Sequence, residues 1–117
     1  MPINSKTNLG QIKVSDAAIA ALAGTAVSEC YGVVGMTAQK ISDGINLLLK
    51  KENYSKGVIV KNREKGIEVD LYVVLSDGVK ISEVVSEIQK RVKYNLERTL
   101  NMDIVAVNVV VKSIRVI

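Results

Sequence analysis

The 117-residue sequence predicts an α+β domain of two layers, with a small mixed or antiparallel sheet of about four strands and helices on one face. Three observations support this class. Two valine-rich segments, 67–76 and 104–117, alternate apolar side chains with the period of strands. Between them, residues 82–100 repeat apolar side chains with the period of an amphipathic helix. Hydrophobic residues make up 48% of the chain, which is enough for a core without metals or disulfides.

The N-terminal part predicts a strand followed by a helix. Residues 1–8 are polar, so we expect a flexible segment ahead of a single domain that covers residues 9–117. Residues 9–14 alternate as a short strand does, and Ser15 suits the N-cap of a helix. The apolar stripe of that helix consists of Ile19, Leu22, Ala23, Ala26, Val27 and Cys30.

The middle of the chain predicts a connection, a second helix and a β-hairpin. Residues 32–35 (Gly-Val-Val-Gly) are expected to form a short connection, and residues 37–51 a weaker helix. Two strands follow, 57–63 and 67–76, joined by a loop that ends in Gly66.

The last part completes the order β-α-α-β-β-α-β. A turn at 76–78 leads into the helix 82–100, in which Glu87 and Arg91 form a favourable i,i+4 pair. The final strand follows at 104–117. The buried face of the helix is expected to consist of Val84, Val85, Ile88, Val92, Leu96 and Leu100.

The residue types that carry most enzyme chemistry are scarce. The chain has no histidine, and its one cysteine, Cys30, lies on an apolar stripe where a small core residue is expected. Glu68 and Asp70 share the face of their strand opposite the apolar one, which indicates a solvated face or an interface. No phosphate, dinucleotide, zinc or calcium motif occurs. We therefore expect no catalytic, cofactor-binding or metal-binding residues, no cofactor and no enzymatic activity.

Charge and hydropathy argue against two further classes of protein, dedicated nucleic-acid binders and membrane-spanning proteins. The net charge of +4 is spread evenly along the chain, so it does not form a dedicated nucleic-acid footprint. A single cysteine fits a reducing cytoplasm. The densest apolar run, 104–111, is far shorter than the ~20 residues of a membrane span. We expect a cytoplasmic protein that reaches a membrane only through a partner.

Two features suggest binding surfaces. Gly32-Val33-Val34-Gly35 has the GXXG form of the loop with which RNA-binding KH domains clamp a nucleotide backbone, with Lys40 nearby. The alternative is that the two glycines only mark a structural break between elements, since two valines occupy the variable positions.

The final strand is the second feature. If its edge is open, it can pair with another strand, and Asn108, Val109 and Val111 are the candidate interface residues. Asn108 has a second interpretation as a structural hydrogen-bonding residue. The basic residues Lys90, Arg91, Lys93 and Arg98 form either a solvated helix face or a site for an acidic partner.

Three blocks of sequence resemble the alkaline shock protein family of bacterial envelope stress response proteins, over about residues 9–114. They are GQIKVSDAAIAALAGTAVSECYGVVGM, KGVIVKNREKGIEVDLYVVLSDGVKISEVVSEIQKRVKYNLE and DIVAVNVVVKSI. The most specific pieces are VDLYVVLSDGVKI, the pairs Ile88-Gln89 and Val92-Lys93, and Val107-Asn108-Val109. Asn101-Met102 departs from the turn that is common in the family, which affects only the geometry of that turn.

The resemblance implies a non-enzymatic cytoplasmic protein of the compact, single-domain branch of that family. Long-tailed relatives self-associate and are held at the inner face of the membrane by a small anchor protein, and compact ones are often encoded beside a kinase-like enzyme. A homo-oligomer and such protein partners are therefore expected. The family has no established catalytic residues. The primary hypothesis is an interaction or scaffold protein, and the competing one is a KH-like RNA-binding module.

Overall fold

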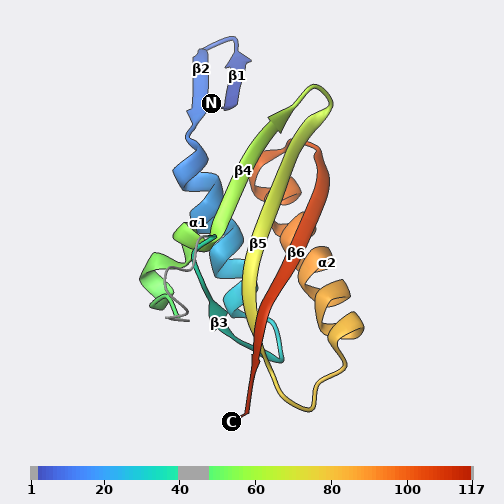
Figure 1. The fold of residues 1–117 in the computed structure, drawn as a ribbon. Helices are drawn as coiled ribbons and strands as arrows, with labels where there is room; N and C mark the ends of the chain where they lie inside the picture. The colour runs from blue at the N-terminus through green and yellow to red at the C-terminus, as the bar shows by residue number, and fades with distance from the viewer. Residues whose placement is uncertain (1–2, 40–47, 117) are drawn as a thin grey trace.

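The computed structural model describes residues 3–39 and 48–116 of the chain and has the predicted α+β architecture (Figure 1). Two α-helices cover one face of a four-stranded sheet, and a separate two-stranded hairpin extends from one end of an elongated body, 53 × 29 × 23 Å overall. The elements are β1 (Ile3–Thr7), β2 (Gly10–Val14), α1 (Asp16–Ser28), β3 (Val33–Met36), the 3-10 helix η1 (Lys51–Gly57), β4 (Val58–Arg63), β5 (Gly66–Ser76), α2 (Ile81–Leu100) and β6 (Ile104–Arg115).

Strand β5 is the centre of the sheet. Along one side it pairs antiparallel with β4 through its first half and with β3 through its second half. Along the other side it pairs with β6, parallel and over its whole length from Ile67 to Ser76. The sheet is therefore mixed, and β6, with 12 residues, is the longest strand at an edge.

The core lies between the sheet and the two helices. Alternate residues of β5 point into it, and four of the six predicted face residues of α2 are buried there. Leu100 is partly buried against the core, whereas Val85 is partly buried but lies outside the core cluster. Figure 1 shows both helices on the same side of the sheet. The most completely buried core side chains from these elements are Ile19, Val27, Ile67, Val69, Leu71, Val73, Leu75, Ile88, Val92 and Leu96.

Local sequence explains where the helices begin, end and pack. The N–H of Ala18 donates to the Oγ of Ser15 at 3.1 Å, which caps α1 as predicted. A Cβ at Gly24 would lie 2.9 Å from Cβ of Tyr54, so the absence of a side chain lets α1 approach η1 closely. Asn101 adopts a left-handed conformation, with φ of 54°, and ends α2.

The N-terminal segment differs from its prediction. The polar composition of residues 1–8 predicts a flexible segment, whereas Ile3–Thr7 forms β1 and pairs antiparallel with β2. The strand at 9–14 is correctly predicted, but its partner is β1 and it lies outside the main sheet. A turn at Asn8-Leu9, followed by Gly10 with φ of 140°, reverses the chain. Isoleucine and threonine, present at Ile3 and Thr7, favour extended structure, so the polar composition of the segment does not exclude a strand.

The segment after α1 also differs. Residues 32–35 were predicted to be a connection, but Val33–Met36 forms β3 on the edge of β5. Of residues 32–35, only Gly32, with φ of 86°, belongs to the turn that precedes β3. Of the predicted helix at 37–51, residues 40–47 lie outside the described part of the chain. The flanking residues 37–39 and 48–50 are not helical, and η1 begins at Lys51.

Candidate interaction surface

The face of the sheet away from the helices carries a connected group of charged and amide side chains. The N–H groups of Asn108 Nδ2 donate to Oε2 of Glu68 at 2.6 Å and to Oδ1 of Asp70 at 2.8 Å. Lys61 Nζ lies 2.8 Å from Oδ2 of Asp70, and Arg63 Nε lies 2.9 Å from Oε1 of Glu68. One amide from β6 thus joins two ion pairs between β4 and β5. We call these five residues the open-face network.

Strand register brings the network together. Asn108 of β6 is the register partner of Asp70 of β5, and Lys61 of β4 is the partner of Glu68. Because side chains alternate between the two faces of a strand, all of these residues share the face opposite Ile67, Val69 and Leu71. The prediction that Glu68 and Asp70 lie together opposite the apolar face is confirmed.

Electrostatics hold both carboxylates in the ionised state. Asp70 is only 8% exposed. Burial would by itself raise its pKa, but hydrogen bonds from Lys61 and Asn108 outweigh burial, so the pKa is lowered. The hydrogen bonds of Arg63 and Asn108 lower the pKa of Glu68, and the bond to Asp70 raises the pKa of Lys61. The network is therefore fully charged and internally paired near neutral pH.

Beyond the network the same face becomes apolar. Tyr72 is buried, and Lys112 Nζ lies 5.8 Å from the centre of its ring. Val110, the register partner of Tyr72, is 39% exposed. A polar region and an apolar region thus follow each other along β5 and β6 on this face.

The outer edge of β6 is divided into two halves. In the first half, side chains of α2 bind the backbone: Gln89 Nε2 donates to the carbonyl of Val107 at 3.0 Å, and Lys93 Nζ donates to the carbonyl of Ile104 at 3.2 Å. The N–H of Ile104 donates to Oε2 of Glu97 at 3.2 Å. These bonds cover the edge where α2 crosses behind β6 (Figure 1).

In the second half, no hydrogen bond from a described α2 side chain reaches β6 between Val109 and Ile114. Backbone groups of successive residues alternate between the two sides of a strand. Because the Val107 carbonyl points away from β5 toward Gln89, those of Val109 and Val111 point outward too. Four and eight residues before Gln89 lie Val85 and Ile81, which have no polar side-chain atom. This half of the edge presents unpaired backbone groups.

The three predicted interface residues do not share one face. Asn108 belongs to the open-face network, whereas the side chains of Val109 and Val111 are partly buried on the helix side and pack against the core. Only their backbone groups face the edge. The exposed apolar side chains missed by the prediction are Val110 and Ile114, the latter 42% exposed. The sequence contains the signal that places Val110 on the other face, because side chains alternate along a strand and Val110 lies between Val109 and Val111.

Three of the four GXXG residues, 33–35, lie in β3, and Gly32 belongs to the turn before it. Val33 and Val34 are partly buried within β3, and Gly35 is buried, with Leu48 and Tyr54 within 3.4 Å of the position of a Cβ. A Cβ at Gly32 would lie 3.0 Å from Val84. Lys40 lies outside the described residues. The described geometry thus gives both glycines structural roles.

The four predicted basic residues separate in space. Arg91 lies on the α1 side of α2, with Glu29 at 3.7 Å and the predicted partner Glu87 at 3.6 Å. Lys90 and Lys93 instead line a hollow of about 240 Å³ beside the first residues of β6. Arg98 is exposed in the last turn of α2.

Cys30 is buried as predicted. Its Sγ donates to the carbonyl of Ala26 at 3.4 Å, and burial raises the pKa of the thiol.

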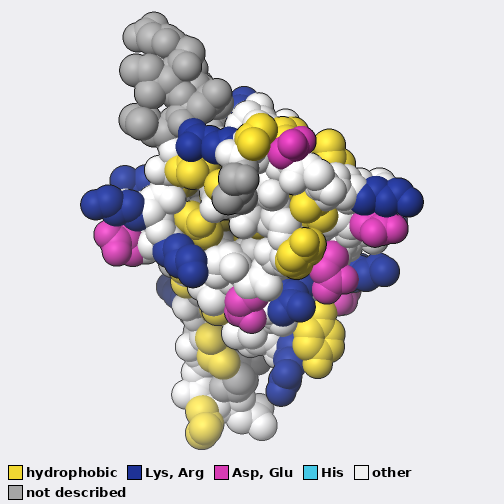
Figure 2. Space-filling model, turned by 90° about the horizontal axis from the view of Figure 1, so that it is seen from below, with side chains coloured by type: hydrophobic (Ala, Val, Ile, Leu, Met, Phe, Trp, Pro, Cys, Tyr) yellow, Lys and Arg dark blue, Asp and Glu magenta, His cyan; other side chains and the backbone are white. Residues whose placement is uncertain are grey.

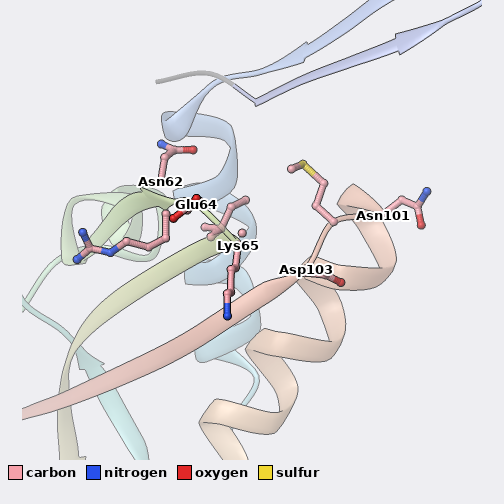
Figure 3. A pocket seen from close by; sticks show the side chains of 9 residues that line it. Asn62, Glu64, Lys65, Asn101 and Asp103 are labelled. Atoms are coloured by element: carbon pink, nitrogen blue, oxygen red, sulfur yellow. The ribbon is translucent and has the colours of Figure 1, made fainter.

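A second hollow, of about 410 Å³, lies at the end of the sheet where two connections meet. Asn62, Glu64 and Lys65 of the β4–β5 hairpin line it on one side, and Asn101 and Asp103 of the connection between α2 and β6 line it on the other. Figure 3 shows these two groups of residues, with the Asn101 side chain pointing away from the hairpin. Its charges are mixed and exposed, so the hollow does not select a ligand class.

The described residues give no support for a metal-binding site or for a membrane-spanning helix. Residues 3–39 and 48–116 contain no group of three or more acidic or cysteine side chains placed to hold a metal ion. Within the same ranges, no helix combines the length and apolar character needed to cross a membrane.

Figure 2, which views the end where the C-terminus lies, shows acidic and basic side chains interspersed with hydrophobic ones.

Comparison with known proteins confirms the resemblance drawn from the sequence. The model of the alkaline shock protein 23 family, described as having a cell envelope-related function, matches residues 4–116. The chain is 48% identical to the uncharacterised protein Spy1614 of Streptococcus pyogenes over 118 residues, which cover 100% of this chain and 98% of that protein. It is 42% identical to the uncharacterised protein YloU of Bacillus subtilis, covering 99% and 98%.

A longer relative, the uncharacterised protein YqhY of Bacillus subtilis, is 33% identical over 102 residues, which cover 87% of this chain and 73% of that protein. No solved structure gave a significant match.

Proposed function

Because the chain belongs to the alkaline shock protein 23 family, whose function is related to the cell envelope, we propose that it is a non-enzymatic interaction protein. It acts as a scaffold through contacts between its own copies and with protein partners. A partner holds it at the inner face of the membrane, either a small anchor protein or a neighbouring enzyme of the kinase-like class.

One observation carries the part of this proposal that concerns protein partners: the outer edge of β6 is open between Val109 and Ile114. An edge strand with unpaired N–H and C=O groups is a template for pairing with another chain, and proteins usually protect such edges. Here α2 protects only the first half. Val110 and Ile114, both partly exposed, add apolar surface beside the open half.

The proposal is tested by recovering the tagged protein from an extract of its own host at moderate salt, and identifying both protein and nucleic acid by mass spectrometry. We expect protein partners with a membrane anchor or an enzyme among them, and more than one copy of this chain per complex. Light scattering of the purified protein over a range of concentrations measures the self-association separately. A monomer that recovers no protein partner would contradict the proposal.

RNA binding through residues 32–35 and Lys40 is the competing hypothesis, and the same experiment separates it. Binding that neutralises several phosphates weakens steeply with salt. Strand pairing adds backbone hydrogen bonds and apolar contacts to any charge contacts, so it weakens less steeply with salt than binding to several phosphates. The matched variant V33D/V34D leaves both glycines in place. Loss of RNA from a folded V33D/V34D protein would support the competing hypothesis.

A further inference from the structure

We propose that the open half of β6 binds an extended, acidic segment of a partner protein, which adds to the sheet as a further strand. This inference rests on the proposed function and names the chemistry of the partner. The backbone groups of β6 support the pairing, and basic side chains near the edge support the sign of the charge.

The backbone part follows from the pattern of hydrogen bonds along β6. The carbonyls of Asp103 and Arg115 accept bonds from Ile67 and Asp77, so both ends of the strand are held toward β5. The backbone groups of Val109 and Val111 point to the opposite side, as the Val107 carbonyl does. An added strand that runs along these residues would complete their hydrogen bonds without disturbing the bonds to β5.

The charge part follows from the side chains that flank the edge. The residues of β6 include two basic ones, Lys112 and Arg115, and no acidic one. Beside its first half, the hollow between α2 and β6 is lined by Lys90 and Lys93. The acidic residue bonded to this edge, Glu97, lies at its far end and pairs with Lys93 at 4.0 Å. A strand paired with Val109 and Val111 therefore meets Lys112 within its own span, and it approaches Lys90 only at the boundary with the covered half.

The same charges argue against a second copy of this chain as the occupant. Antiparallel pairing of two β6 strands would bring Lys112 and Arg115 of both copies to one seam, where like charges repel. The N-terminal hairpin, residues 3–14, contains Lys6 and Lys13 and no acidic residue, so a hairpin from another copy is also poorly matched. Acidic side chains that alternate with apolar ones complement both the lysines and Val110.

The test uses synthetic peptides of about nine residues in which valine and glutamate alternate, with blocked ends. Two matched peptides serve as controls: one with lysine in place of glutamate, and one with N-methyl groups on alternate residues, which cannot donate to an edge. Each is titrated into the isotope-labelled full chain, and the amide resonances are followed by NMR. We expect the acidic peptide to bind at least about tenfold more tightly than the lysine peptide, with shifts centred on Val109 and Val111.

A charge-reversed variant, K90E/K112E, sharpens the test because neither side chain belongs to the core. It should remain folded by circular dichroism and prefer the lysine peptide. Equal binding of both peptides, or binding of the methylated peptide, would overturn the inference. The inference would also be overturned if the amides of Val109 and Val111 became protected from hydrogen exchange as the concentration of the protein alone is raised. A second copy would then occupy the edge. Failure here with protein partners still recovered from the host would leave the proposed function standing.

Discussion

Strands β5 and β6 have similar valine-rich sequences and lie side by side, yet they differ in what surrounds them. β5 is paired along both sides and is buried on both faces from Val69 to Leu75. β6 is paired along one side, and its exposed residues include Val105, Val110 and Ile114. The comparison teaches that β5 holds the fold together, whereas β6 supplies surface that is available for binding.

The largest expected effect comes from shortening a core side chain of β5. Leu71 is completely buried, so L71A should lower the free energy of unfolding by about 2–5 kcal/mol through lost burial and the cavity that remains. The matched change in β6, V110A, should cost less than about 1 kcal/mol, because Val110 is partly exposed. Urea denaturation measures both. Similar losses in the two strands would remove the distinction between them.

The next effect tests the connection between the strands. N108A leaves the carboxylates of Glu68 and Asp70 without the amide that joins them, and we expect a loss of about 1–3 kcal/mol. A double-mutant cycle with D70A isolates the part that depends on the pair. If N108A and D70A were additive, Asn108 would not couple β6 to β5 through Asp70.

The pH dependence of stability tests the same network without touching Asn108. The folded-state pKa values of Glu68 and Asp70 lie below their ordinary values of 4.5 and 3.8. Their contribution is therefore fully present above those values and is lost as the pH falls through the lower folded-state values. The variant E68Q/D70N should lose less stability than the parent between pH 7 and pH 3, as followed by thermal unfolding. Equal losses would show that other groups dominate acid unfolding.

The smallest expected effect on stability concerns the covered half of the edge. Q89A removes one partly buried hydrogen bond to the carbonyl of Val107, so the free energy of unfolding should change by about 1 kcal/mol or less. The open edge should become longer, and binding of the acidic peptide should tighten. Q11A in β2, which is equally an exposed glutamine, serves as the control. Unchanged binding by Q89A would mean that α2 does not limit the edge.

Local sequence patterns predicted most of the elements. The buried face of α2 (except Val85), the β4–β5 hairpin and the N-cap Ser15 each depend on residues close together in the chain, and these predictions are confirmed. The strand β3 could not be found in this way. Gly32 just before it and Gly35 within it both signal a turn, and residues 33–36 become a strand only because the edge of β5 is available to them.

The surface properties depended on contacts between distant residues. Asn108 donates hydrogen bonds to Glu68 and Asp70, which lie 40 and 38 positions earlier in the chain. Residues next to Asn108 in the sequence therefore could not predict these partners. Alternation placed Glu68 and Asp70 correctly on one face. It could not show which strand forms an edge, because β5 and β6 carry the same valine-rich signal and only the topology distinguishes them. The division of the β6 edge further depends on where Gln89 and Lys93 of α2 reach it.

Amide hydrogen exchange of the full chain, alone and in the complex recovered from its host, tests the central claim most directly. In the isolated protein, the amides of Leu71 and Val73 in β5 should be protected and those of Val109 and Val111 should exchange rapidly. In the complex, Val109 and Val111 should become protected while β5 stays unchanged. Rapid exchange of Val109 and Val111 in both states would contradict the claim that the open half of β6 binds a partner.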